Sequence, residues 1–515
     1  MKTINIKHNG LRLFGMGAVI AGLALTFSSC SLDRDPISSA SEITEGSQTD
    51  TTTAVLKDRV AAQSQLTAIY QLFRNRQEHF HLDYVLLGDA HSDNAYAGTT
   101  GQETIPLETN ALDAATGTLS RDWTRYLADI AQANVLLGGI EPLHQNGQLT
   151  DKEYNEMKGQ GEIFRAIQMF RMARMWGSFP VITKIAKTIT SGNIEDVYPT
   201  YFPPRSTEEE CYQQIISDLT DAEQNAPDFQ SSDRTLMTKT VAQALLCKVY
   251  AETAVQDYDK VIEYAEKVRN TPGLQLEPDF STLWGWDDTK KDCVKRNTSE
   301  GILEVHWLPG AGNWESWMFG KCLEDPEANF TWAKWVTPSR DLIKAFDDEG
   351  DTVRKNQTIV YYSCNWSNYY PSANYPFMYK LRSGYNSEYI LRLADIILLE
   401  AEAYAHKGDI SQASQLVNMI RNRAKLPNLT ASATASQQAI EDAVLHERRL
   451  ELALEGERWY DLRRAGKVEE VMNSLPSRDS GHLSLARPYT KNSYLMPIPQ
   501  TALDENDNLI QNPGY

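Results

Sequence analysis

Two apolar helical patterns joined by a short turn constrain the fold of this chain more than any other feature of its sequence. They lie between Leu391 and Pro427 and flank the turn Lys407-Gly408-Asp409. Apolar residues recur at i, i+3, i+4 and i+7 in both patterns, which predicts two amphipathic helices. Four or so pairs of this kind would form a solenoid-like helical scaffold.

The spacing of small and aromatic residues in this hairpin matches a tetratricopeptide repeat. Small Ala401 and Ala413 would let two helices approach, and Tyr404 would fill the groove between them. The segment from Thr240 to Val268 is interpreted as a second pair, centred on Tyr250. The alternative, a set of unrelated helical hairpins, stays open on periodicity alone. The predicted fold class is mainly α, a tetratricopeptide-like scaffold of helical hairpins with an irregular, loop-rich aromatic lobe.

Further helical patterns divide the chain into a scaffold and a lobe. One apolar face runs through residues 66–73, another through 123–137 and a third through 161–176, and Ser206-Thr207-Glu208-Glu209 predicts a capping-box helix start. The scaffold is expected to occupy residues of about 55–270 and 390–470. The loop-rich ligand lobe would occupy about 274–389, and a C-terminal segment would follow at 471–515.

The first 30 residues have the pattern of an export signal. Lys2, Lys7 and Arg12 precede an apolar run of 15 residues, which ends at Ser28-Ser29 before Cys30. As a helix this run spans about 22 Å, less than the roughly 30 Å hydrocarbon core of a bilayer. A cysteine after two small residues resembles a bacterial lipobox, although Phe27 stands where Leu is usual.

We therefore predict a lipoprotein signal peptide at 1–29 and a lipidated Cys30. Ordinary secretory cleavage beside an incidental cysteine is the alternative. Residues 30–54 are rich in Ser and Thr and would form a flexible tether, and the folded body would occupy 55–515. Several acyl chains would make a lasting membrane anchor.

The charge of the chain excludes nucleic acid as a partner. The net charge is −19, and removing the three positive charges of the signal shifts it to −22. No Lys/Arg run supplies the basic patch that nucleic-acid binding requires.

Cysteine spacing argues against a metal site. The five cysteines after Cys30 form no CxxC pair and no metal-like spacing with His. Cys211 and Cys247 lie in helical patterns and are expected to be buried thiols. Cys293, Cys322 and Cys364 lie in irregular sequence, where an oxidising compartment would permit one disulfide, and their pairing stays open. No metal and no cofactor are predicted.

Aromatic residues are concentrated in the lobe. Seven of the 11 tryptophans lie between Trp284 and Trp335, in sequence rich in Gly, Pro and Asn, and Tyr361 to Tyr379 adds a second aromatic cluster. Loops with this much aromatic surface, carried by a rigid helical frame, are where a binding site is expected.

The charged segment from His446 to Arg464 does not have the pattern of a catalytic motif. Leu450 stands where a zinc protease would have its second histidine. Glu447, Arg448 and Glu451 have the spacing of an ion-pair network between packed helices. No nucleophile elbow, P-loop or dinucleotide fingerprint is present, so no enzyme activity is predicted.

Three segments of the chain together resemble the SusD/RagB family of outer-membrane lipoproteins from bacterial glycan-uptake systems. They are Cys30-Ser31-Leu32-Asp33, the charged segment from His446 to Arg464, and the C-terminal pair Leu495-Met496-Pro497-Ile498-Pro499 and Asn508 to Tyr515. The resemblance covers nearly the whole chain after the signal. It identifies a family but not a ligand.

The resemblance implies a non-catalytic receptor for oligo- or polysaccharides. Such a receptor would be lipid-anchored in the outer membrane through palmitate-modified Cys30 and exposed on the cell surface. It would pass glycan to a SusC-like TonB-dependent transporter. The acidic residues after Cys30 resemble the surface-export signal, interrupted here by Arg34. A surface glycoside hydrolase and a peptide-binding or structural partner of the transporter are the alternatives. Sugar type, linkage and chain length stay open.

Sugar chemistry suggests which residues would bind the glycan. A pyranose stacks its apolar C–H face on Trp or Tyr, while its hydroxyls bind amides, carboxylates and guanidinium groups. For any single tryptophan, core packing or transporter contact is the alternative. The candidate ligand-binding residues are Asn313, Trp314, Trp317, Trp332 and Trp335 in the lobe, and Asp89, His91, Asn94 and Tyr96 in an earlier polar loop where the family often contacts ligand.

Overall fold

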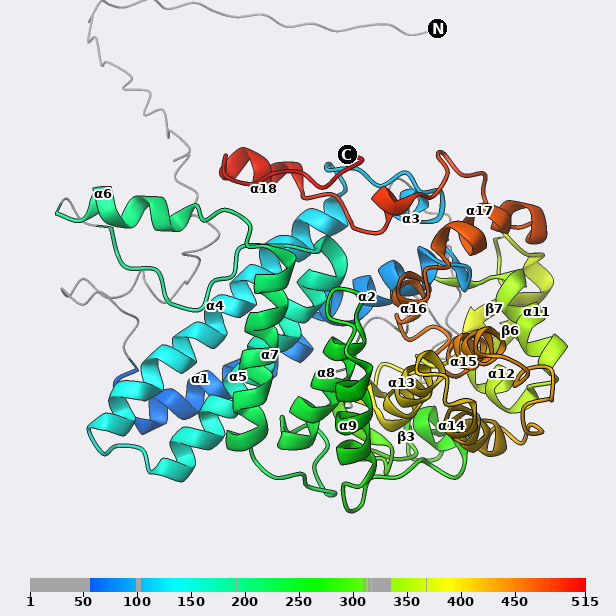
Figure 1. Ribbon diagram of the computed structural model, residues 1–515, viewed down its shortest axis with the longest axis horizontal. Helices are drawn as coiled ribbons and strands as arrows, with labels where there is room; N and C mark the ends of the chain where they lie inside the picture. The colour runs from blue at the N-terminus through cyan, green and yellow to red at the C-terminus, as the bar shows by residue number, and fades with distance from the viewer. Residues whose placement is uncertain are drawn as a thin grey trace, which may run out of the picture. The chain divides into compact units, whose positions relative to one another are not determined.

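Helices form the frame of the protein (Figure 1). The computed structural model describes residues 56–98, 103–189, 192–308, 312, 313, 316, 335–366 and 368–515, so the predicted signal, Cys30 and the tether lie outside the described residues. The longer helices are α1 (Arg59–Asn75), α4 (Gly117–Gln145), α5 (Asp151–Trp176), α7 (Glu208–Asn225), α8 (Lys239–Ala251), α9 (Tyr258–Arg269), α13 (Leu393–His406), α14 (Ile410–Arg423) and α15 (Gln437–Glu451). From α4 to α9 each long helix packs against the next, and α13 continues the row beside α9.

The helical hairpin predicted between Leu391 and Pro427 is confirmed as α13 and α14. Gly408 takes the left-handed conformation in the turn, with φ of 78°. The Asp409 side chain accepts a hydrogen bond from the Gln412 backbone N–H at 3.0 Å, which caps α14. Ala401 and Ala413 are fully buried where the two helices meet. The second predicted pair is confirmed as α8 and α9.

The capping box of α7 begins one residue later than the sequence pattern predicts. The Thr207 hydroxyl accepts from the Glu210 backbone N–H at 3.1 Å, and the Glu210 carboxylate accepts from the Thr207 N–H at 2.8 Å. Ser206 is used by the preceding loop instead, because its backbone N–H donates to the Phe179 carbonyl. The capping box therefore forms at Thr207, because the backbone N–H of Ser206 is already bonded to the preceding loop.

Short strands interrupt the helical frame in the loop-rich lobe. They pair antiparallel in two-stranded sheets, β2 with β3, β4 with β8, and β6 with β7, while β5 pairs with β1. Two helices of this lobe, α11 and α12, were not predicted, although Ser339 caps α11 and Gly350 ends it. The strands are β1 (Ala95–Tyr96), β2 (Trp286–Asp287), β3 (Asp292–Cys293), β4 (Gly301–His306), β5 (Thr337–Pro338), β6 (Ile359–Tyr362), β7 (Tyr375–Met378) and β8 (Ser387–Arg392), and the helices are α11 (Arg340–Glu349) and α12 (Thr352–Thr358).

The remaining helices are short. They are η2 (Glu78–Leu82), α2 (Asp83–Val85), η3 (Leu86–Ala90), α3 (Ile105–Glu108), α6 (Ile194–Val197), η4 (Tyr198–Tyr201), η5 (Phe280–Trp284), η6 (Ser372–Asn374), α16 (Arg458–Arg464), α17 (Val468–Arg478), η7 (Lys491–Ser493) and α18 (Gln500–Glu505). Within the described ranges, no helix is long and apolar enough to span a membrane.

The cysteines follow the sequence prediction in part. Cys211 and Cys247 are buried free thiols in α7 and α8, as expected. Cys293 and Cys364 are also free thiols, and Cys322 lies outside the described residues.

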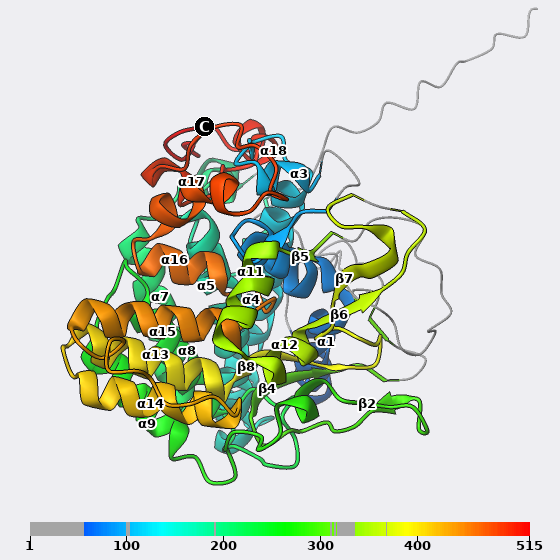
Figure 2. The same cartoon turned by 90° about the vertical axis from the view of Figure 1, so that its right-hand side faces the viewer.

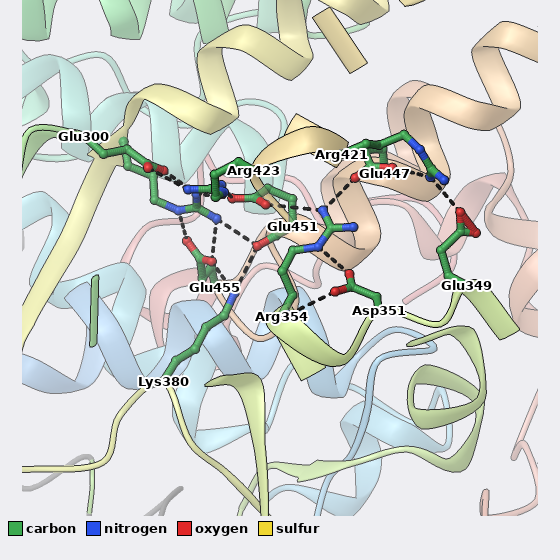
Figure 3. Close-up of polar contacts among 11 residues, drawn as sticks. Glu300, Glu349, Asp351, Arg354, Lys380, Arg421, Arg423, Glu447, Glu451 and Glu455 are labelled. Atoms are coloured by element: carbon green, nitrogen blue, oxygen red, sulfur yellow. Dashed lines mark hydrogen bonds and ion pairs between the residues drawn. The ribbon is translucent and has the colours of Figure 1, made fainter. Parts of the chain in front are cut away.

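A buried cluster of ion pairs joins α15 to its neighbours (Figure 3). Glu451 is fully buried at the end of α15. Its carboxylate binds Arg392 of β8 at 2.6 Å, Arg423 of α14 at 2.5 Å and Arg354 of α12 at 3.3 Å. One carboxylate thus holds together segments that lie far apart in the sequence.

Two more carboxylates of the segment join the cluster. Glu447 lies one turn earlier on the same face of α15, and Glu455 lies in the turn that follows the helix. The predicted ion-pair network is therefore confirmed, with partners from outside the motif. The other pairs of the cluster are Glu447 with Arg354 and Arg421, Glu455 with Lys380 and Arg392, Glu300 with Arg392 and Arg423, Glu349 with Arg421, and Asp351 with Arg354.

Two glycines allow the N-terminal part of the body to touch the turn after α15. Gly456 has φ of 83°, and a Cβ on it would lie 2.4 Å from the Tyr84 ring. A Cβ on Gly88 would lie 2.1 Å from the Gly456 carbonyl oxygen. Both positions therefore exclude any side chain.

We expect Glu451→Gln to lower the free energy of unfolding by about 3–5 kcal/mol, because it leaves buried guanidinium groups without their countercharge. Glu263→Gln is the matched control. Its carboxylate is 42% exposed and pairs with Lys260 and Lys267, so we expect a change below about 1 kcal/mol. Urea denaturation measures both, and equal losses would contradict the role assigned to the cluster.

The cost of Glu451→Gln should also depend on pH. Burial alone would raise the pKa of Glu451, but Arg423, Arg392 and Arg354 hold it well below its usual value. The ionised native carboxylate therefore stabilises the fold above the unfolded pKa of about 4.3, and this stabilisation is lost as the pH falls below it. Denaturation curves should show the difference between wild type and variant shrinking in acid, and a difference that grows in acid would be inconsistent.

We expect Gly456→Ala to destabilise the protein by roughly 2 kcal/mol more than Gly466→Ala. Both glycines have positive φ, so both variants carry the left-handed strain of about 1–2 kcal/mol. A Cβ on Gly466 meets nothing within 4 Å, whereas one on Gly456 meets Tyr84. Thermal and urea denaturation of the two variants separate strain from crowding, and similar losses would show that the close approach costs nothing.

Candidate functional site

Asn313 anchors the start of the tryptophan-rich loop. Its backbone N–H donates to the Gly384 carbonyl at 2.8 Å, and its side-chain amide donates to the Glu388 carboxylate at 2.7 Å. The other oxygen of Glu388 lies 2.7 Å from Nδ1 of His81. Asn313 is 8% exposed and is held by these partners, and its role as a ligand contact stays a prediction.

The tryptophans of the lobe have different environments. Trp307 directly follows β4 and lies in the core, with its ring centroid 6.0 Å from that of His81. Trp284 is also buried. Trp335 is half-buried and packs against the main core. Trp314, Trp317 and Trp332 lie outside the described residues, so their role as ligand contacts stays a prediction.

The polar loop containing Asp89 and Asn94 faces inward. The Asp89 carboxylate accepts from the Asn94 amide at 2.8 Å and from the backbone N–H groups of Leu454 and Gly456 at 3.2 and 2.6 Å. Burial raises the pKa of Asp89 to about 7. The side-chain oxygen of Asn94 accepts from Arg449 Nε at 2.9 Å. Both side chains are fully buried and hold the C-terminal motif in place, and their role as ligand contacts stays a prediction.

His91 and Tyr96 are also buried, and both contact residues from distant parts of the chain. His91 Nδ1 lies 2.6 Å from the Leu107 carbonyl, and its ring packs on Trp459 with centroids 4.1 Å apart. Burial lowers the pKa of His91 to about 4. The Tyr96 hydroxyl donates to Asp479 at 2.6 Å. His91 and Tyr96 therefore make structural contacts, and the expected ligand contacts at these two residues stay a prediction.

The partners of this polar loop lie in the charged segment from His446 to Arg464. That segment carries five arginines and five carboxylates, so its composition does not indicate that its arginines take partners from elsewhere in the chain. Asp93 is such a partner, since it binds Arg458 at 2.8 Å and Arg449 at 3.1 Å. The pairing of this loop with the charged segment was therefore not predictable from the sequence.

A small buried cavity of about 90 Å³ lies beneath β8 and brings several carboxylates together. Glu455 there binds Lys380, and Glu457 binds Arg174 at 2.9 Å and Lys248 at 3.0 Å. Burial alone would raise the pKa of Glu457, but Arg174 and Lys248 hold it well below its usual value. Glu457 is therefore held in its charged form, whereas a general acid requires a raised pKa.

The charged motif offers no metal site either. His446 is partly exposed and lies 3.7 Å from Glu349. Within the part of the chain that the structure describes, no cluster of three His, Cys, Asp or Glu residues has the arrangement to hold a metal ion.

An open groove of about 360 Å³ lies on the surface of the loop-rich lobe. Its wall combines the aromatic residues Tyr361 and Tyr370 with the charged residues Arg340 and Asp347. The sequence marked the aromatic cluster from Tyr361 onward. It did not mark Arg340, which reaches the groove from α11 and carries no motif of its own.

Two family profiles match the chain. A profile described as the SusD family matches residues 341–515, and a profile described as starch-binding associating with outer membrane matches residues 44–251. The first includes the charged motif, and the second includes α1 to α7.

Similar proteins cover most of the chain. SusD-like protein P2 of Formosa agariphila is 27% identical over 471 residues, which are 84% of this chain and 88% of that protein. A SusD-like protein of Bacteroides ovatus is 25% identical over 485 residues, which are 86% of this chain and 81% of that protein.

Solved structures share the fold. A SusD homolog from Bacteroides thetaiotaomicron superposes with a TM-score of 0.73 at 19% identity, covering 90% of this chain and 98% of that one. A structure described as a laminarin-binding SusD-like protein superposes with a TM-score of 0.70 at 23% identity, covering 89% of this chain and all of that one. Profile matches at both ends and relatives aligned over more than four fifths of the sequence show that the chain belongs to the SusD/RagB family.

Proposed function

We propose that this protein is a non-catalytic glycan-binding protein of the bacterial outer membrane. Family membership carries the proposal, because one matching profile is described as starch-binding and one solved relative as laminarin-binding. The described geometry is compatible with it, since a rigid helical frame supports an aromatic lobe. Oligo- or polysaccharide is the proposed ligand.

The tryptophan-rich loop is the proposed primary binding site. Trp314, Trp317 and Trp332 would stack on sugar rings, with Trp335 beside them at the edge of the core. Asn313, which precedes Trp314 in the sequence, supports this assignment, because its two hydrogen bonds fix the chain at that residue.

The proposed setting is the cell surface. Lipidation at Cys30 would tether the body to the outer membrane, and a SusC-like TonB-dependent transporter would receive the glycan. The description of one matching profile as associating with outer membrane supports this placement. A tether of about 25 residues with the composition of 30–54 would let the body move above such a partner.

Glycoside hydrolysis is the less favoured alternative. A hydrolase needs two carboxyl groups flanking one bond, one of them with a raised pKa. The carboxylates Glu455 and Glu457 of the buried cavity are instead paired with cations. A peptide-binding or purely structural partner of the transporter is the other alternative.

We expect the protein to bind glycans on an immobilised glycan array, and Trp314→Ala combined with Trp317→Ala to weaken binding at least tenfold. Loss of two stacking contacts of about 1 kcal/mol each accounts for this factor. Trp286→Ala is the control, because Trp286 lies in the same lobe but outside the proposed loop.

Three results would separate the alternatives. Unchanged affinity of the double variant would place the site elsewhere. Time-dependent release of oligosaccharides from a polysaccharide incubated with the protein would favour the hydrolase. Binding of peptides but not of glycans would favour the peptide-binding partner.

We expect Cys30→Ser to abolish incorporation of labelled palmitate and to move the protein from the membrane to the soluble fraction. The serine hydroxyl cannot replace the thiol that is acylated. Cys364→Ser is the matched control, since Cys364 is a partly exposed free thiol in the lobe. Palmitate labelling in both variants or in neither would contradict acylation at Cys30.

A further inference from the structure

The groove of about 360 Å³ lies between α11 and the end of the β6–β7 hairpin. Figure 2 shows α11 beside β6 and β7, and the lining residues come from both sides of this junction. All of them belong to the described part of the chain. Its volume falls within the range of small-ligand pockets, roughly 300–1,000 Å³.

One wall of the groove is aromatic. Tyr361 of β6 is 37% exposed and lines the groove. Tyr370 is half-buried and held in place, because its hydroxyl donates to the Pro338 carbonyl at 2.8 Å. Ile343 and Pro371 extend the apolar surface. Tyr370 is therefore held in position in this wall, and Tyr361 is its more exposed tyrosine.

Arg340 is held rigidly at the other side. Its guanidinium stacks on the Tyr370 ring, 4.2 Å from the ring centroid. It donates to the Tyr96 hydroxyl at 3.1 Å and to the Tyr369 carbonyl. Tyr96 is itself fixed by its bond to Asp479. The guanidinium is therefore oriented before any ligand arrives.

Arg340 differs from the arginines of the buried cluster in having no acidic partner. Those arginines each bind one or more carboxylates, whereas Arg340 forms no ion pair within the described ranges. Asp347, on the rim of the groove, pairs with Lys355 at 2.5 Å, and Asn374 adds an amide. The groove therefore offers oriented donors and acceptors beside an apolar ring.

We infer that this groove is a second saccharide-binding site, distinct from the tryptophan-rich loop. Tyr361 would stack on the C–H face of one pyranose unit. The Arg340 fork would donate to adjacent hydroxyl oxygens, and Asp347 and Asn374 would bind hydroxyls on the rim. This inference rests on the proposed glycan-binding function and assigns a second contact to the same glycan chain.

The test uses the full mature protein on the same glycan array, in a concentration series. We expect Tyr361→Ala to lower the apparent affinity for array glycans about fivefold, the equivalent of one stacking contact. Tyr361→Trp should restore it, because the indole keeps an aromatic face. Tyr362→Ala is the matched control, since Tyr362 is 38% exposed on the same strand but does not line the groove.

A combined variant tests whether the two sites are independent. With Trp314 and Trp317 both changed to Ala, residual binding to the array should remain, and adding Tyr361→Ala should remove it. Thermal denaturation of every variant shows that it is folded.

Two failures can be told apart. If the wild type binds no array glycan, the proposed function falls and this inference falls with it. If the wild type binds but neither Tyr361→Ala nor Arg340→Met changes the affinity, the groove is not a saccharide site while the proposed function stands. An equal loss in Tyr362→Ala would also overturn the assignment.

Discussion

The ion pairs around Glu451 are the interaction on which the C-terminal half of the structure depends. A carboxylate buried to this degree is costly unless every part of it is paired. Its three arginines come from β8, α12 and α14, so these segments must all be in place before the charge is satisfied. The cluster therefore makes the packing of these distant segments cooperative (Figure 3). It also fixes how the helices are positioned against each other.

The turn that follows α15 extends this constraint to the N-terminal part of the body. Asp89 accepts from the backbone of Leu454 and Gly456, and Gly88 lies against the Gly456 carbonyl. Glu457 then binds Arg174 of α5. Helices from both ends of the sequence thus meet at one turn. The lobe that carries the candidate binding surfaces packs on these helices. There His81 pairs with Glu388, and Glu388 accepts a hydrogen bond from Asn313, next to Trp314 in the sequence.

Much of the frame was predictable because it depends on local periodicity. The hairpin α13–α14 and the pair α8–α9 follow from apolar residues at helical spacing. The ion-pair role of Glu447 and Glu451 followed from the same spacing. The burial of the polar loop was not predicted, because Asp89 and Asn94 have the composition of a ligand loop but are buried against Leu454, Gly456 and Arg449. Local composition does not say whether a polar group faces water or a buried partner.

The sequence by itself determined the helical-hairpin class, the aromatic character of the lobe and the family resemblance. Each of these depends only on the spacing of nearby residues or on contiguous motifs. Only the tertiary structure decided which polar residues are buried, which charges are paired and which are left open. Arg340 shows the difference most clearly. Its guanidinium becomes a candidate ligand contact because Tyr96, Tyr369 and Tyr370 orient it and it forms no direct ion pair within the described residues. Contacts between residues so far apart in sequence are set by packing.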